Sequence, residues 1–269
     1  MDLIDIGCNL THDTFDPDRD EVIAHAVNAG VVQMVVTGAS AQGSNAAFEL
    51  ARSRPGQLFA TAGVHPHHAS QYSGETDRLL RELCEKDEVV AAGETGLDYF
   101  RDLSPRQDQI KAFESQLQIG ADTGLPLFLH LRDAHVDFHP ILKSWRHKLS
   151  DLVVHCFTGT REELTVYLDL DCYVGITGWI CDERRGSHMK EFMTEIPSDR
   201  LMIETDAPYL KPRNLTPKVK SNRNEPQWLP WILTELANSR SQSPEQLALQ
   251  TTENARRFFR LPTPDNNAG

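Results

Sequence analysis

The chain has 269 residues, 39% of them hydrophobic and 25% charged, and its formal net charge is −12 at pH 7. This composition excludes a disordered chain, and the acidic charge argues against a simple DNA-binding module because it repels polyanions at long range. The sequence has no basic and apolar leader at its start and no uncharged apolar run of about 18 residues, so neither export nor membrane spanning is expected. Five scattered cysteines without a C-x-x-C pair are typical of reduced thiols, and we predict a cytoplasmic protein.

Eight short apolar segments, rich in β-branched residues, alternate along the chain with longer segments of helical character. The expected strands are 3–7, 31–37, 58–65, 89–94, 126–130, 152–155, 172–177 and 201–206. The expected intervening helices are 18–29, 42–54, 76–85, 105–122, 134–147, 161–169 and 187–195. After the eighth strand, a loop rich in Pro, Lys and Asn over 211–226 leads to two further helices, 227–239 and 244–259.

Strict alternation of strand and helix, with strands that are continuously apolar, predicts a parallel sheet covered by helices. Eight such units predict an α/β fold that closes into a single TIM-type (β/α)8 barrel over residues 1–260, with extra C-terminal helices. Residues 261–269 are expected to form a flexible tail. An open doubly wound sheet is the alternative, but it would use fewer strands and a G-x-G-x-x-G turn, which the first strand end lacks.

Five candidate metal ligands stand at the predicted carboxyl ends of five strands, namely His65, Glu94, His130, His155 and Asp206. Catalytic groups of such barrels lie at these strand ends. One histidine after an apolar run is more often a hydrogen-bonded structural residue, but packing alone would not place five such groups at the same end of the sheet. We therefore predict that Glu94, His130, His155 and Asp206 bind metal and that His65 takes part in catalysis beside them.

Imidazole and carboxylate ligands suit magnesium, manganese or zinc rather than calcium. We expect Mg²⁺ in function, with Mn²⁺ or Zn²⁺ as alternatives, and one or two ions, which Glu94 could bridge. Asp206 is the candidate for deprotonating a water at the metal, either as ligand or as general base. Glu204 lies two residues earlier on the same strand face, where it is either a catalytic acid that orients a ligand histidine or a buried structural acid.

Basic side chains near the predicted strand ends could bind phosphates of a nucleic acid. Residues 207–224 contain five basic and no acidic residues, which fits either a nucleic-acid contact or a solvated loop. Aromatic residues in the same loops could stack on bases or only roof the core. The predicted substrate-binding residues are Arg132, Arg184, Arg185 and Arg223, although such arginines also commonly pair with nearby acids.

Five motifs resemble the TatD family of metal-dependent deoxyribonucleases among the amidohydrolase-like barrels. They are AGVHPH at 62–67, AGETGLDY at 92–99, LHLRDA at 129–134, VHCFTG at 154–159 and IETDAPY at 203–209, followed by RNEP at 223–226. The resemblance implies a 3′-to-5′ exonuclease on single-stranded DNA or RNA with a role in DNA repair. It also assigns metal binding to Glu94, His130 and His155, with Asp206 at the catalytic metal and His65 near the site.

One departure from the family pattern concerns the first strand, which in many relatives ends with His-x-His. Gly7 and Asn9 stand at these positions, so the resemblance predicts a weakened or empty second metal position. An amide, ester or lactone hydrolase of the same barrel type is an alternative, but it would more often retain His-x-His and a bridging lysine. A non-catalytic binding or quality-control protein is the alternative from another class. No obligate protein partner is predicted.

Overall fold

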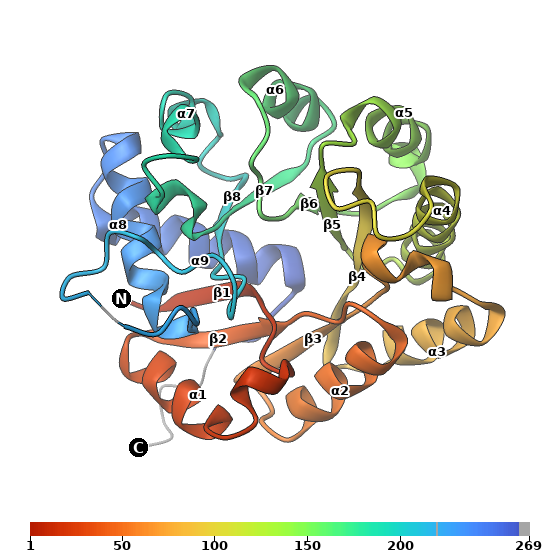
Figure 1. Cartoon of the computed structure of the whole chain (residues 1–269), viewed down its shortest axis with the longest axis horizontal. Coiled ribbons are helices and arrows are strands. Elements are labelled where there is room, and N and C mark those ends of the chain that lie inside the picture. Colours follow the sequence, from red (N-terminus) through yellow and green to blue (C-terminus); the bar gives the residue numbers. More distant parts are fainter. Residues whose placement is uncertain (219, 264–269) are drawn as a thin grey trace.

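The computed structural model describes residues 1–218 and 220–263, in which eight parallel strands form one sheet in the order β1 to β8 (Figure 1). The sheet closes at its carboxyl end, where the Asp206 N–H donates to the Gly7 carbonyl (2.8 Å) and the Asn9 N–H donates to the Ala207 carbonyl (2.7 Å). The predicted eight-stranded barrel is therefore confirmed. The strands are β1 Leu3–Cys8, β2 Val31–Val36, β3 Leu58–Ala62, β4 Val89–Asp98, β5 Leu127–Arg132, β6 Leu152–Val154, β7 Tyr173–Ile176 and β8 Leu201–Ile203.

The helices between the strands form an outer ring around the barrel (Figure 1). Side-chain caps begin several of them; the Ser40 hydroxyl, for example, accepts from the Gly43 N–H at 3.0 Å. The predicted helix 187–195 is divided into a short helix and a 3-10 turn, Met193–Glu195. The helices are α1 Arg19–Asn28, α2 Ala41–Arg52, α3 Gly74–Cys84, α4 Arg106–Thr123, α5 His135–Trp145, α6 Arg161–Asp169, α7 Ser187–Lys190, α8 Leu229–Arg240 and α9 Pro244–Phe259.

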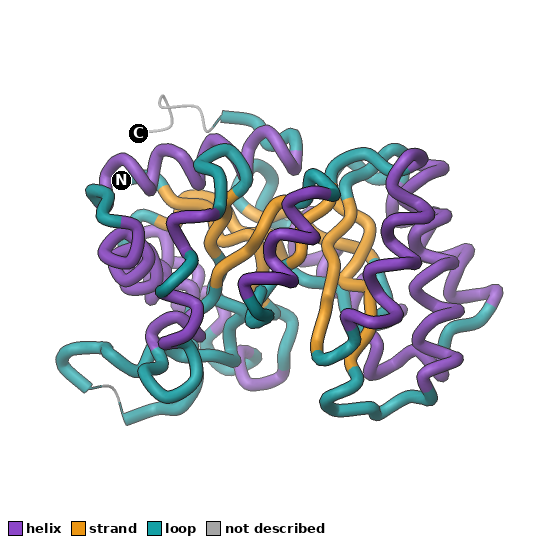
Figure 2. Tube along the Cα trace, turned by 90° about the horizontal axis from the view of Figure 1, so that it is seen from above, coloured by secondary structure: helices purple, strands orange, loops and turns teal. Residues whose placement is uncertain are grey.

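Helix α9 closes the amino-terminal end of the barrel, opposite the long loops (Figure 2). Phe258 and Phe259 pack with side chains of the barrel interior, including Val35 and Met202. Leu261 belongs to the same buried cluster, and the Pro262 carbonyl accepts from the Gln33 side chain at 3.0 Å. Within the predicted flexible tail, Leu261 and Pro262 thus contact the barrel, while residues 264–269 lie outside the described residues, so the tail stays a prediction.

Four strands differ by two residues or more from their predicted carboxyl ends at the mouth of the barrel: β5 extends two residues further, to Arg132, β8 ends three residues earlier, at Ile203, and β3 and β4 differ as follows. Strand β3 ends at Ala62, and His65 instead caps a 3-10 helix, Pro66–Gln71. Strand β4 continues four residues past Glu94 to Asp98, because Leu97 and Asp98 pair with Leu131 and Arg132 of β5. Glu94 therefore lies within a strand rather than at its end. Among residues 1–218 and 220–263, no helix has both the length and the apolar character that a membrane span requires.

Candidate metal centre

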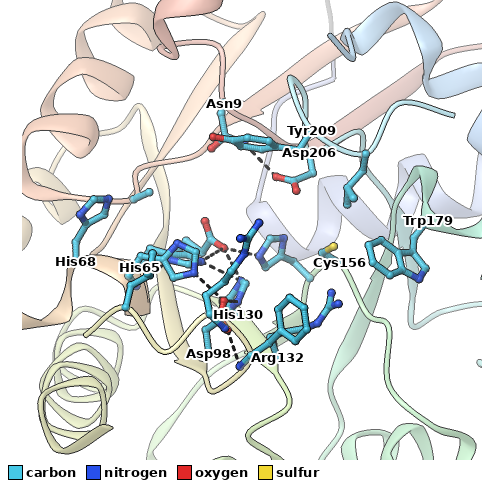
Figure 3. A pocket seen from close by; sticks show the side chains of 18 of the residues that line it. Asn9, His65, His68, Asp98, His130, Arg132, Cys156, Trp179, Asp206 and Tyr209 are labelled. Atoms are coloured by element: carbon cyan, nitrogen blue, oxygen red, sulfur yellow. Dashed lines mark hydrogen bonds and ion pairs between the residues drawn. The ribbon is translucent and has the colours of Figure 1, made fainter. Parts of the chain in front are cut away.

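A pocket of about 1140 Å³ opens at the carboxyl ends of the strands (Figure 3). The strand-end residues predicted from the sequence all border it, which brings together side chains up to 141 positions apart, from position 65 to position 206. Glu204 lies below the pocket floor, fully buried, and is absent from its lining. The five residues at the pocket are His65, Glu94, His130, His155 and Asp206.

Glu94 is the hub of the buried cluster at the pocket floor. Its Oε1 lies 2.7 Å from His155 Nε2, 2.9 Å from His130 Nδ1 and 3.4 Å from His65 Nε2. Burial disfavours the ionised carboxylate, but the imidazoles that face it outweigh this effect and hold the pKa of Glu94 well below its ordinary value. A carboxylate surrounded by imidazole nitrogens is a donor set that suits a divalent transition metal or magnesium.

Two histidines of the cluster, His155 and His130, have carboxylate neighbours that favour a positive charge at their rings. Burial by itself would lower the pKa of His155, but the carboxylates of Glu94 and Glu204 raise it well above its ordinary value. His130 behaves similarly, since Asp98 and Glu94 raise its pKa against the effect of burial. Its Nε2 is buried 3.4 Å from Asp98 and makes no well-formed hydrogen bond to any described residue. The residues therefore fit a metal ion, which would replace protons as it bound.

Each of the two predicted ligand histidines has a second carboxylate behind it. His155 Nδ1 lies 3.3 Å from Glu204, whose other oxygen accepts from the Cys156 N–H at 2.5 Å. His130 Nε2 faces Asp98, as described above. A carboxylate behind a ligand imidazole fixes its tautomer and its orientation. Of the two interpretations of Glu204, the geometry favours the acid that orients His155, without direct access to substrate.

Asp98 and His67 are site residues that the sequence reasoning did not single out. His67 Nε2 lies 2.7 Å from Asp98 Oδ2, and both side chains border the pocket. One signal could have found Asp98: it lies four residues after Glu94 in a β-rich segment, and even spacing places both on one face of a strand. His67, two residues after His65 within the AGVHPH motif, carried no comparable periodic signal.

His65 belongs to two groups whose donor atoms all lie within 4.8 Å, one with His67 and Asp98 and one with Glu94 and His130. Its Nδ1, however, accepts a hydrogen bond from the His67 backbone N–H at 3.0 Å. Burial lowers the pKa of His65 well below its ordinary value, so the ring is neutral and Nε2 carries its proton. His65 is therefore better suited to donate a hydrogen bond beside a metal than to bind it.

Gly7 and Asn9, the two positions at which the resemblance leads us to expect His-x-His, have other roles here. A Cβ atom at Gly7 would collide with the Glu204 carboxylate, and one at Gly175 would lie 2.7 Å from its other oxygen. The two glycines thus leave the space that Glu204 occupies. The Asn9 amide donates to Asp206 Oδ1 at 3.0 Å. Gly7 therefore leaves room for the Glu204 carboxylate, and Asn9 holds the Asp206 carboxylate in place.

Asp206 is the predicted ligand that stands apart from the cluster around Glu94. It faces the pocket beside Asn9, and its backbone has a positive φ of 54° (Figure 3). Burial raises the pKa of Asp206 to about 7. Such a carboxylate can accept a proton near neutral pH. Its role as a metal ligand stays a prediction.

The four predicted substrate-binding arginines divide into two pairs. Arg132 and Arg185 border the pocket, but Arg184 and Arg223 do not. The guanidinium of Arg184 lies 3.3 Å from Asp182, and that of Arg223 lies 2.6 Å from Asp18 and 2.8 Å from Glu225. Their contact with substrate stays a prediction that the geometry does not favour, because nearby acids already occupy their donors.

Comparison with known proteins places these features among relatives. A sequence model of TatD related DNases matches residues 4–260. A protein of Erwinia billingiae named 3′-5′ ssDNA/RNA exonuclease TatD is 51% identical over 260 residues, which cover 97% of this chain and 100% of that relative. A protein of Salmonella typhimurium with the same name is 48% identical over 96% of this chain and 99% of its own length. The crystal structure of a hydrolase TatD family protein from Entamoeba histolytica superposes with a TM-score of 0.86 and 28% identity, covering 96% of this chain and 98% of that one.

Proposed function

Because the chain belongs to the family of TatD-related DNases, we propose that it is a divalent-metal-dependent nuclease that shortens single-stranded DNA or RNA from the 3′ end. The observation that carries the proposal is the convergence of three imidazoles on Glu94 Oε1 at the floor of an open pocket. Relatives that carry the name 3′-5′ ssDNA/RNA exonuclease TatD match this chain over nearly the whole of their own length, which supports the proposal.

Glu94, His130 and His155 would hold the metal ion. When bound, a divalent cation supplies a Lewis acid for a phosphate oxygen and lowers the pKa of water. Asn9 donates to Asp206 Oδ1, which orients the carboxylate and leaves Oδ2 to take the proton of the attacking water. That water attacks phosphorus as the opposite phosphorus–oxygen bond of the terminal linkage breaks, and the departing oxygen takes a proton from solvent. The Nε2–H of His65 points at the same cluster, where it can donate to the charge that develops on the phosphate.

The finer features of the centre follow from its donor set. Magnesium is the proposed ion in function, with manganese or zinc as alternatives, because imidazole and carboxylate ligands admit all three. Gly7 and Asn9 supply no imidazole, so one resident ion is expected and a second would arrive with the substrate.

We propose that the protein acts in the cytoplasm; its role in DNA repair and its independence of protein partners stay predictions.

A time course on single-stranded DNA with a 5′ label tests the proposal, with Mg²⁺, Mn²⁺ or Zn²⁺ in parallel. We expect a series of 5′-labelled products that become progressively shorter with time. Glu94→Ala should lower the rate by more than about 100-fold, which exceeds the loss typical of residues that only orient a metal ligand. Circular dichroism checks that the variant is folded. A folded Glu94→Ala protein with full activity would reject the metal assignment. Hydrolysis of small esters or lactones without turnover of DNA or RNA would favour the alternative hydrolase.

A further inference from the structure

One wall of the pocket carries two arginines and two aromatic rings that alternate in space, which we call the guanidinium ladder: Phe100, Arg132, Trp179 and Arg185. The guanidinium carbon of Arg132 lies 4.8 Å from the centre of the Phe100 ring and 4.9 Å from that of Trp179. The guanidinium carbon of Arg185 lies 5.4 Å from the centre of the Trp179 ring. The members come from the segments after β4, at the end of β5 and after β7, and Figure 3 shows Arg132 and Trp179 bordering the pocket.

The two ladder arginines differ in their surroundings from Arg184 and Arg223. Within residues 1–218 and 220–263, neither Arg132 nor Arg185 makes an ion pair to a carboxylate, although the net charge of the chain is −12. Stacking on a ring uses the flat face of a guanidinium and leaves the N–H groups at its edge free. Both cations therefore stand at the pocket with hydrogen-bond donors available, and an aromatic ring rather than an acid holds each of them.

Trp179 supports these arginines rather than serving as a platform for bases. Its ring already contacts two guanidinium groups, and its indole N–H donates to the Arg185 carbonyl at 3.3 Å, which ties it to the loop that carries Arg185. Tyr209 is 52% exposed at the same pocket and contacts neither ladder arginine, so its ring is a surface open for base stacking.

We propose that the guanidinium ladder binds a backbone phosphate of the substrate strand, next to the phosphate at the metal centre. Arg132 and Arg185 donate to its oxygens, and Trp179 and Phe100 are positioning residues. Arg132 lies two residues beyond His130 on β5, about 6.6 Å along the strand. The inference rests on the proposed function, and because a 3′-to-5′ exonuclease cuts the last linkage, the bound phosphate lies on its 5′ side.

Single neutral linkages in the substrate test this proposal directly. A single-stranded oligonucleotide is made with one methylphosphonate at the first, second or third linkage 5′ to the terminal one, and kcat/KM is measured for wild type and Arg132→Ala. With the unmodified strand, Arg132→Ala should lower kcat/KM by about 10- to 100-fold, as expected for a lost charged hydrogen bond. At one of the three positions the methylphosphonate should cost wild type a similar factor and cost Arg132→Ala almost nothing, because the contact is already gone.

Salt dependence and conservative variants give readouts that a merely structural role would not move. Loss of one phosphate contact should reduce the slope of log KM against log salt by about 0.7 for a single strand. Trp179→Phe keeps a ring and should retain most of the slope, whereas Trp179→Ala should lose as much of it as Arg132→Ala. Arg132→Lys keeps the charge but has no planar guanidinium to pack on the rings, so its salt slope should lie between those of wild type and Arg132→Ala.

Arg52→Ala is the matched control. Arg52 also stacks on a ring, that of Phe48 at 5.4 Å, and it ends α2 at the amino-terminal side of the barrel, away from the pocket. The Arg52→Ala substitution removes the same charge as Arg132→Ala and should leave kcat/KM and the salt slope unchanged. Equal losses for Arg132→Ala at every methylphosphonate position, or a wild-type salt slope in Arg132→Ala, would overturn the ladder proposal. If wild type itself fails to degrade the unmodified strand, the proposed function fails instead.

Discussion

The two ends of the barrel are made from the same eight strands but have opposite chemistry. At the amino-terminal end, α9 seals an apolar interior with Phe258 and Phe259, which are almost fully buried. At the carboxyl-terminal end, buried carboxylates and imidazoles surround Glu94. Apolar burial stabilises a fold, whereas buried charges cost free energy unless they are paired. The closed end therefore stabilises the scaffold on which the open end keeps its charged groups.

The closed end offers the largest expected effect on stability. Phe258→Ala removes a fully buried ring that packs on Tyr173 and Phe259, and should lower the free energy of unfolding by about 3–5 kcal/mol. Activity well below the melting temperature should stay within about twofold of wild type. Urea unfolding and exonuclease rates measure the two quantities. Val136→Ala, at a residue 75% exposed, is the control; a matching loss of activity in Phe258→Ala would show that the two ends are not separable.

The open end should show the reverse response. In Glu204→Gln the new amide N–H₂ can face His155 Nδ1, which would then accept and leave the proton on Nε2, the atom that points at Glu94. Metal affinity should fall by about 10- to 100-fold, as for other groups that orient a ligand histidine. Calorimetric titration with Mn²⁺ measures this, and urea unfolding in the absence of metal should change much less. Unchanged Mn²⁺ affinity would remove Glu204 from the site and leave it a structural acid.

Asp5 lies at the seam between β1 and β8, where its protonation should make stability depend on pH. It accepts from the Thr205 backbone N–H at 2.9 Å and lies 2.5 Å from the Thr205 hydroxyl. Burial raises the pKa of Asp5 from 3.8 to about 8. Between about pH 4 and pH 8 the Asp5 carboxyl is therefore protonated in the native state but ionised in the unfolded chain. The stabilisation from this proton is complete below about pH 4 and is lost as the pH rises to about 8.

Asp5→Asn removes that titration while retaining hydrogen-bonding groups of similar size. Relative to wild type, its melting temperature should rise by about 10 °C between pH 5 and pH 8, because a pKa of about 8 against 3.8 in the unfolded chain corresponds to about 3–4 kcal/mol over this range. Differential scanning calorimetry with a chelator present isolates this effect from metal binding. A constant difference between the two proteins across this range would show that Asp5 is ionised in the native state.

Much of the candidate site could be predicted from the sequence because strand ends are local features. The apolar segments that precede Glu94, His130 and His155 mark strands, and parallel strands of a barrel bring their carboxyl ends together. The even spacing of Asp98 from Glu94 hints at a shared strand face, but the extra length of β4 that makes this spacing count depends on pairing with β5. His67 reaches the pocket through the 3-10 helix that replaces the predicted end of β3.

Residues that are neighbours in sequence show most clearly what only the tertiary structure decided. Arg184 and Arg185 are identical in type and adjacent, yet one pairs with Asp182 and the other stacks on Trp179 at the pocket. The sequence determined the barrel and the donor set, because the order of strands and helices and the residues at their ends are set by local periodicity. Only the folded chain decided which carboxylate orients which histidine and which arginine stays free, because those contacts depend on side-chain directions across distant strands.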